Sequence, residues 1–131
     1  MFCKIIFCKQ YLLHRGDQMV YKIDPEKDRQ YIEEFRLCPV GHHSPGLMRV
    51  LNTLRHDTSG HQIILVTRVA FKEWIIGIMP PSRDNAIVYL TDRVFHSREE
   101  AEWEVFCQRW EKHTGEKLNS PHKPMIGDKT C

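Results

Sequence analysis

The sequence lacks the features that would assign it to a membrane, to nucleic acid or to a familiar catalytic centre. No apolar run approaches the ~18–20 residues that a transmembrane helix needs. The formal net charge is only +2, and the lysines and arginines are scattered without interleaved aromatic residues, so neither nucleic acid nor a membrane is an expected partner. No glycine-rich phosphate loop, HExxH or GxSxG motif occurs. With 131 residues, 41% of them apolar and 27% charged, the chain is expected to form one globular domain.

Paired cysteine spacing is also missing. The chain has five cysteines, an odd number, and no CxxC motif. This pattern is typical of reduced thiols in a cytosolic protein, and we therefore expect a cytoplasmic location.

The sequence gives little support to a metal site. A structural zinc site needs four ligands, usually in two close pairs. The candidate ligands are Cys38, His42, His43 and His56. Cys38 and His42 have a plausible spacing, but the side chains of the adjacent His42 and His43 are expected to point apart, and a second pair is missing. We expect this chain to hold neither a metal nor a cofactor.

The two ends of the chain differ from its middle. Residues 1–18 carry lysines within their apolar part and lack a small-residue cleavage site, which argues against a signal peptide. Ordinary composition begins at Met19, and we hypothesise that Met19 is the native start and residues 1–18 an N-terminal extension. Residues 19–118 are expected to form a single domain, and the polar residues 119–131 a flexible tail.

The clearest element in the sequence is a helix that begins at Pro45 and fades after Arg55. Ser44 is a natural N-cap, because its hydroxyl can accept a hydrogen bond from an unpaired amide of the first turn. Pro45 follows at the first helical position, where its missing N–H costs nothing. An apolar stripe then recurs at helical spacing: Leu47, Val50, Leu51 and Leu54.

A similar start signal precedes an earlier helix. Asp24 is the expected N-cap and Pro25 the first helical residue. The helix should end near Leu37, because Pro39 disfavours a helical conformation in the residue before it. Its shared face comprises Asp28, Tyr31, Ile32 and Phe35.

Runs rich in β-branched residues predict three strands, at residues 62–68, 71–79 and 87–90. The short connection between the first two favours an antiparallel hairpin. The predicted order is therefore α-α-β-β-β-α, an α+β fold with a small three-stranded antiparallel sheet and about three helices.

The last helix is predicted to begin with a capping box. Ser97 can accept a hydrogen bond from the amide of Glu100, and the Glu100 carboxylate can reach back to the amide of Ser97. Gly115 is a suitable residue just past the end of the helix. The stripe along this helix is aromatic: Trp103, Phe106, Cys107 and Trp110. We interpret this face as core or as a subunit interface.

Candidate catalytic pairs have simpler explanations. Cys107 falls on the expected buried face, which suits an inert thiol. Ser44 beside His43 could act as nucleophile and base, but the cap role accounts for Ser44, so we expect no catalytic residue. His42 and Arg49 near the helix N-terminus could bind an anion or a carboxylate of a partner, with solvated or structural roles equally open.

Two stretches taken together resemble a known family. The first is His42-x-Ser44-Pro45-x-Leu47-x-Arg49-Val50-x-Asn52, and the second is Asp92-x-x-Phe95 followed by Glu99-Glu100-Ala101, Val105-Phe106 and Arg109. In this order and at a similar separation, they are similar to the small (alpha) subunit of N,N-dimethylformamidase. The resemblance covers residues 41–110.

This resemblance implies an accessory subunit of a hetero-oligomer. In that family a large subunit carries the active site, a mononuclear iron held by tyrosines and a glutamate, and hydrolyses an amide to an amine and formate. The expected partner is therefore a large catalytic subunit, and iron is expected there. The residues assigned to the partner contact are His42, Arg49, Asn52, Trp103 and Trp110.

Arg49 is the central residue of that assignment. Capping does not require an arginine one turn into a helix, and a planar guanidinium with five donors suits a bidentate pair with a partner's carboxylate. His43 and Gly46 depart from the family's pattern, which leaves the substrate of the complex open. The alternative, from a different class, is a stand-alone protein-interaction or regulatory domain.

Overall fold

The structure, a computed structural model, describes residues 21–56, 59–119 and 121, which form three helices and a three-stranded sheet. In chain order the elements are α2 (Arg29–Leu37), α3 (Pro45–Arg55), β1 (Gln62–Val69), β2 (Glu73–Met79), β3 (Val88–Phe95) and α4 (Arg98–Thr114). This confirms the predicted order and the α+β class. Among these residues, no helix is both long and apolar enough to cross a membrane.

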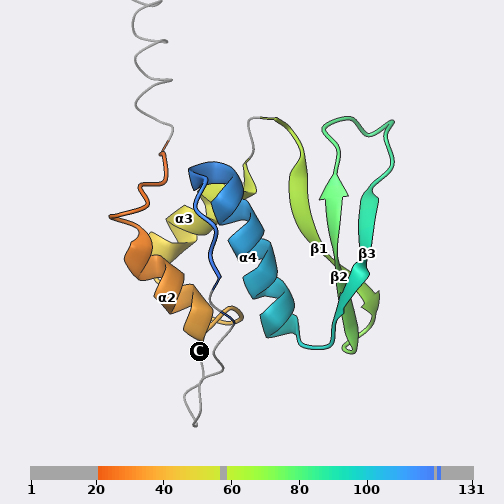
Figure 1. The fold of residues 1–131 in the computed structure, drawn as a ribbon, viewed down its shortest axis with the longest axis horizontal. Coiled ribbons are helices and arrows are strands. Elements are labelled where there is room, and N and C mark those ends of the chain that lie inside the picture. Colours follow the sequence, from red (N-terminus) through yellow and green to blue (C-terminus); the bar gives the residue numbers. More distant parts are fainter. Residues whose placement is uncertain (1–20, 57–58, 120, 122–131) are drawn as a thin grey trace, which may run out of the picture.

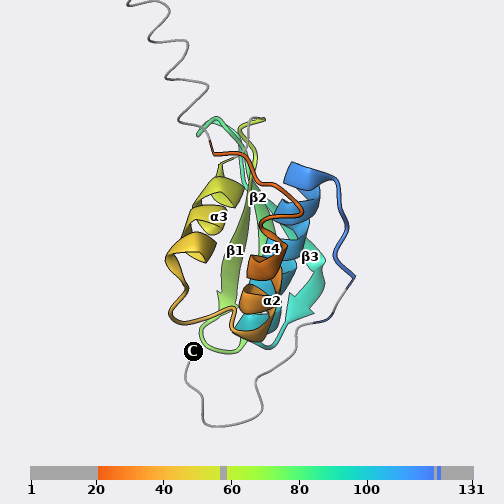
Figure 2. The same cartoon turned by 90° about the vertical axis from the view of Figure 1, so that its left-hand side faces the viewer.

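The elements stack in three layers with α4 in the middle (Figure 1). One side of α4 covers the sheet, and its other side packs against α3. Viewed from that other side, α2 and α3 lie next to each other in front of α4 (Figure 2). The helix at the end of the described fold therefore joins its two outer layers.

The sheet is antiparallel, with β2 between β1 and β3. The registers Leu65↔Ile76 and Ile76↔Leu90 align apolar side chains across all three strands on the face that α4 covers. An irregularity between Thr67 and Val69 interrupts the first pairing. The predicted hairpin is thus present, and the third strand joins it at the edge of β2.

Two groups of buried side chains lie on opposite sides of α4. The helical group comprises Ile32, Phe35, Leu47, Val50, Leu51, Leu54, Trp103, Phe106 and Trp110. Its rings stack in a row, with centroids 4.6 Å apart for Phe35 and Phe106 and 5.9 Å apart for Phe106 and Trp110. The sheet group comprises Ile76, Phe95, Ala101 and Val105. One helix therefore supplies residues to both cores.

Several predicted boundaries shift for local reasons. The first helix begins at Arg29 rather than at Pro25, although Asp24 Oδ1 does accept from the amide of Glu26 at 3.0 Å. The second strand begins at Glu73 rather than at Phe71, because Phe71 has a φ of 61° and turns the chain. The third strand extends to Phe95, beyond the predicted end at residue 90.

The two predicted serine caps differ. The Ser44 hydroxyl accepts from the amide of Leu47 at 3.2 Å, which confirms that cap. The capping box at Ser97 is wrong, because the Ser97 hydroxyl donates to Oε2 of Glu99 at 2.9 Å and makes no cap hydrogen bond. Gly115 ends α4 in the left-handed conformation, with a φ of 77°, as expected for its position.

The cysteine prediction holds in part. Cys107 is a free thiol, half-buried on α4, and burial raises its pKa to about 12. Cys38 is disulfide-bonded, so the expectation of reduced thiols fails for that residue. The predicted extension at residues 1–18 lies outside the described residues, and so does the tail predicted at 119–131 apart from residues 119 and 121.

Candidate partner-binding site

The N-terminus of α3 is held by a carboxylate of α2. Besides its cap contact, the Ser44 hydroxyl donates to Oε2 of Glu34 at 2.8 Å, and the Ser44 amide donates to Oε1 at 2.9 Å. A carboxylate is favourable here because the helix N-terminus carries a partial positive charge. Among the described residues no hydrogen bond joins Ser44 to His43, so the structure does not form the serine–histidine pair weighed from the sequence.

Arg49 lies on the exposed side of α3 and stacks on the chain's own N-terminal segment. Its guanidinium carbon lies 4.7 Å from the centre of the Tyr21 ring, a cation–π contact. Tyr21 donates its hydroxyl to the carboxylate of Asp28, a buried residue with 3% of its surface exposed. Burial and that hydrogen bond raise the pKa of Tyr21 to about 12. The ring under Arg49 is therefore fixed in place as a neutral donor.

The stacking leaves the donor edge of Arg49 unused. In the part of the chain that the structure describes, no side chain or carbonyl accepts a hydrogen bond from its guanidinium. A guanidinium that stacks through its face keeps its N–H groups available for a carboxylate in the same plane. Arg49 is thus oriented by Tyr21 and still able to bind.

Asn52 lies next to Arg49, whereas His42 is not joined to either. Asn52 is exposed and three residues from Arg49, which places the two on one face of α3. The Asn52 Oδ1 accepts from Nη1 of Arg55 at 3.5 Å. His42 is exposed in the connection before the helix, and no described contact links it to Arg49 or Asn52.

The two tryptophans assigned to the partner contact lie inside the chain. Trp103 is 4% exposed and Trp110 is 0% exposed, and both belong to the helical core. The Trp110 indole N–H also donates to Oε2 of Glu116 at 3.3 Å. The sequence left open whether this aromatic stripe belongs to the core or to a subunit interface. The structure supports the core, because side chains without exposed surface cannot contact another protein. Of the residues assigned to the partner contact from the sequence, those on α3 that remain exposed are Arg49 and Asn52.

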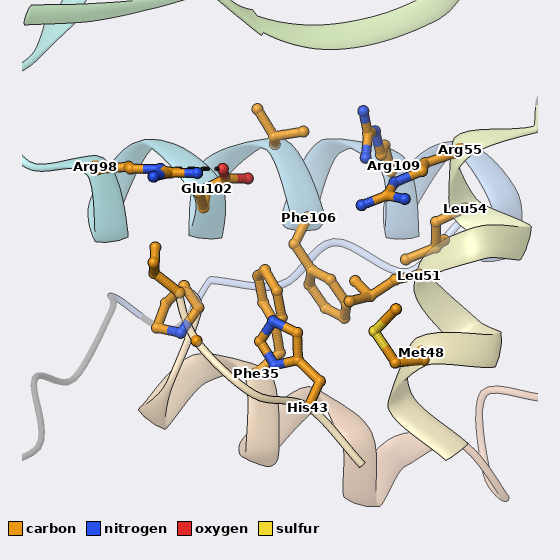
Figure 3. Close-up of a pocket in the computed structure, with 14 residues that line it drawn as sticks. Phe35, His43, Met48, Leu51, Leu54, Arg55, Arg98, Glu102, Phe106 and Arg109 are labelled. Atoms are coloured by element: carbon orange, nitrogen blue, oxygen red, sulfur yellow. Dashed lines mark ion pairs between the residues drawn. The ribbon is translucent and has the colours of Figure 1, made fainter. Parts of the chain in front are cut away.

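A pocket that sequence reasoning did not anticipate opens between α3 and α4 (Figure 3). We call it the α3–α4 pocket; its volume is about 310 Å³. Its apolar lining includes Phe35, Met48, Leu51, Leu54, Val105 and Phe106. Its charged lining consists of Arg55, Arg98, Glu102 and Arg109.

The guanidinium groups of Arg55 and Arg109 lie at one end of this pocket. Arg109 is anchored, because its Nε donates to the Ile63 carbonyl at 3.0 Å and its Nη2 donates to the same oxygen. Burial lowers the pKa of Arg109, and the positive charge of Arg55 lowers it further. At the other end, Arg98 pairs with Glu102 at 3.7 Å, drawn as the dashed line in Figure 3.

His43 forms part of the pocket wall. Its ring lies 5.5 Å from the Phe35 ring, tilted by 40°. Its Nδ1 is buried and finds no hydrogen-bond partner among the residues that the structure describes. His43 therefore packs as an aromatic side chain against the helical core.

The described residues offer no alternative centre built on metal ligands. In residues 21–56, 59–119 and 121, no group of three or more His, Cys, Asp or Glu side chains is arranged to hold a metal ion.

Sequence reasoning missed the glutamate that holds Ser44 and the arginines of the pocket. Glu34 and Ser44 are ten residues apart, and Arg55 and Arg109 come from helices on either side of the sheet-forming segment. The helical stripe analysis singles out apolar positions only, so these polar residues carry no periodic signal. Arg109 does stand in the second quoted motif, which was the one hint available.

A comparison with protein families gives a match over most of the chain. The family model described as N,N-dimethylformamidase alpha subunit matches residues 11–120. No curated protein matches the chain.

Proposed function

The chain belongs to the N,N-dimethylformamidase alpha-subunit family, and on that premise we propose that it is the non-catalytic small subunit of an iron-dependent amidohydrolase. In this proposal a large partner subunit holds the iron and hydrolyses an amide to an amine and formate. The small subunit binds the large one through the exposed face of α3.

The observation that carries the proposal is the state of Arg49. Its guanidinium is stacked on Tyr21 at 4.7 Å, is exposed, and has no hydrogen-bond acceptor among the described residues. An oriented side chain loses less conformational entropy when it binds than a free one. Arg49 is thus prepared for a bidentate pair with a carboxylate of the large subunit, with Asn52 as a neighbouring polar contact.

The non-catalytic role is supported by what the candidate nucleophiles do. The Ser44 hydroxyl is engaged by Leu47 and Glu34, and burial keeps the Cys107 thiol protonated by raising its pKa to about 12. A nucleophile needs an activating base or a lowered pKa. Cys107 has neither, and the Ser44 hydroxyl hydrogen-bonds a carboxylate at a helix cap rather than a histidine. His42 keeps its proposed place at the edge of the contact, because it is exposed beside the start of α3.

The test is the affinity of Arg49 variants for the large subunit, measured on co-purified complexes by dilution and native mass spectrometry. Arg49→Ala should weaken the complex by ~2–5 kcal/mol, mainly through faster dissociation, because it leaves the partner's carboxylate unpaired. Arg49→Lys should recover only part of the affinity, since an ammonium cannot form the planar two-point contact. Arg83→Ala is the matched control: Arg83 is exposed in the turn between β2 and β3, far along the chain from α3.

A thermal melt of the same variants separates binding from folding. Loss of an exposed cation–π contact costs ~0.5–1 kcal/mol, so the Arg49→Ala domain should melt only slightly earlier. Unchanged association would refute the role of Arg49. A chain that hydrolyses the amide, or retains one equivalent of iron, without the large subunit would refute the non-catalytic assignment.

A further inference from the structure

The α3–α4 pocket combines an apolar surface with a pair of arginines. Its lining is apolar in part, with the exposed side chain of Met48 over the buried Leu51 and Phe106. Two arginines of different helices, Arg55 and Arg109, meet at one end. Burial is the main cause of the lowered pKa of Arg109, and the like charge of Arg55 lowers it further. An anion between the two guanidinium groups would remove that repulsion.

The acidic group of the pocket fills this role only in part. Glu102 is the one carboxylate among the residues that line it, and its charge acts on Arg109 while it pairs with Arg98 at 3.7 Å. Arg109 spends two of its donors on the Ile63 carbonyl, and Arg55 makes a single contact to Asn52 at 3.5 Å, at the limit of a hydrogen bond. Counting Arg55, Arg98 and Arg109 against Glu102, the lining carries three positive charges and one negative charge. The pocket therefore has an excess of positive charge and unused donors at the arginine end.

The size and the walls of the pocket define the rest of the ligand. A volume of about 310 Å³ is at the lower end of the range for small-molecule sites. Phosphate esters and polyanions would leave the exposed Met48 side chain uncovered, and a single carboxylate matches the planar, two-point geometry of guanidinium groups. An apolar tail of a few carbons or one ring would cover the exposed side chain of Met48.

We propose that the α3–α4 pocket binds a small monocarboxylate with a short apolar tail, its carboxylate between Arg55 and Arg109 and its tail against the exposed side chain of Met48. This site differs from the proposed Arg49 contact, because Arg49 stacks on Tyr21 and does not line the pocket, but it adjoins the partner contact through the hydrogen bond from Arg55 to Asn52. A ligand held by both helices would tie α3 to α4, so occupancy should stabilise the helical layer.

The experiment titrates the intact complex with benzoate, and with benzamide as the uncharged molecule of the same shape. Heat of binding and melting temperature are recorded, with acetate as the carboxylate that lacks a tail. Benzoate should bind and raise the melting temperature as its concentration rises. Acetate should bind at least tenfold more weakly for want of a tail, and benzamide at least tenfold more weakly because it lacks the charge.

Arg55→Gln is the decisive variant, because Arg55 is exposed and its loss leaves the Arg109–Ile63 anchor intact. It should weaken benzoate binding by about 10- to 100-fold, the usual effect of losing a hydrogen bond to a charged group, and leave benzamide binding unchanged. Arg83→Gln is the control for net charge and should bind benzoate as the unmodified chain does.

Three results would overturn the proposal. Equal binding of benzoate and benzamide would mean a merely apolar pocket. Full affinity in Arg55→Gln would place the benzoate elsewhere. Binding by the free chain but not by the complex would mean that the large subunit occupies or covers the pocket.

Discussion

Replacing Ser44 by alanine tests how α2 and α3 are joined. The substitution removes the cap to the Leu47 amide at 3.2 Å and the donation to Glu34 Oε2 at 2.8 Å. A serine cap contributes ~1 kcal/mol, and a hydrogen bond to a charged group contributes ~1.5 kcal/mol or more. The backbone contact from the Ser44 amide to Glu34 at 2.9 Å survives. We therefore expect a loss of about 2–2.5 kcal/mol in the free energy of unfolding.

The chain provides its own matched control. Ser97 is the N-cap of α4, but its hydroxyl contacts only the exposed Glu99 and makes no cap hydrogen bond. Ser97→Ala should therefore lower the free energy of unfolding by less than ~0.5 kcal/mol. Both values come from urea denaturation, where a shift in midpoint at constant slope reports stability.

A double-mutant cycle isolates the Glu34 contribution. Glu34→Gln keeps an oxygen acceptor but loses the charge, so alone it should cost about 1 kcal/mol. Combined with Ser44→Ala it should cost less than the sum of the two, with a coupling of ~1 kcal/mol, because the residues share one hydrogen bond. Strictly additive values, or equal losses for Ser44→Ala and Ser97→Ala, would show that Glu34 does not hold the start of α3.

Three further predictions follow from burial and backbone conformation. Trp110→Ala should cost ~3–5 kcal/mol and unfold the helical layer, as circular dichroism would show, because Trp110 has no exposed surface. Burial raises the pKa of Cys107 from 9.0 to about 12, so the thiol ionises at a lower pH in the unfolded chain than in the folded one. The free energy of unfolding should therefore fall as the pH rises from about 9 towards 12. In Cys107→Ala the urea midpoint should fall less over the same pH range. Gly115→Ala should cost ~1 kcal/mol, because a φ of 77° strains a residue with a Cβ, and a thermal melt that shows no loss would contradict this.

Hydrophobic periodicity and capping residues predicted the helices and strands well, because these signals depend on residues close together in the chain. The apolar stripe of α3 is buried at all its positions, and the predicted order of elements is confirmed. The same signals could not predict that Ser44 and Ser97 make different contacts. The Ser44 hydroxyl donates to Glu34 of another helix, whereas the Ser97 hydroxyl donates to Glu99 of the same turn. The sequence therefore predicts which residue stands at the N-cap position, but not which hydrogen bonds its side chain makes.

The candidate site was harder to predict, because it depends on which faces meet. The spacing of Trp103 and Trp110 identifies an apolar face but not its partner, and the structure shows that the partner is the chain itself. Arg49 was found as an exposed polar residue, but its stacking on Tyr21 joins segments that no periodic pattern relates. The charged end of the α3–α4 pocket likewise exists only after Arg55 and Arg109 are brought together by folding.

The central position of α4 has a consequence for how the protein is made. A ribosome releases the chain from its N-terminus, so α2, α3 and all three strands emerge before the helix that lies between them. Until then, Phe35 and Leu51 on one side and Ile76 and Phe95 on the other lack the surface that covers them. The nascent chain therefore leaves the apolar face of α2 and α3 uncovered from the end of α3 until α4 is made, a state prone to aggregation. Native packing is completed in one late step when α4 arrives, and a chain cut before Arg98 should not hold either layer.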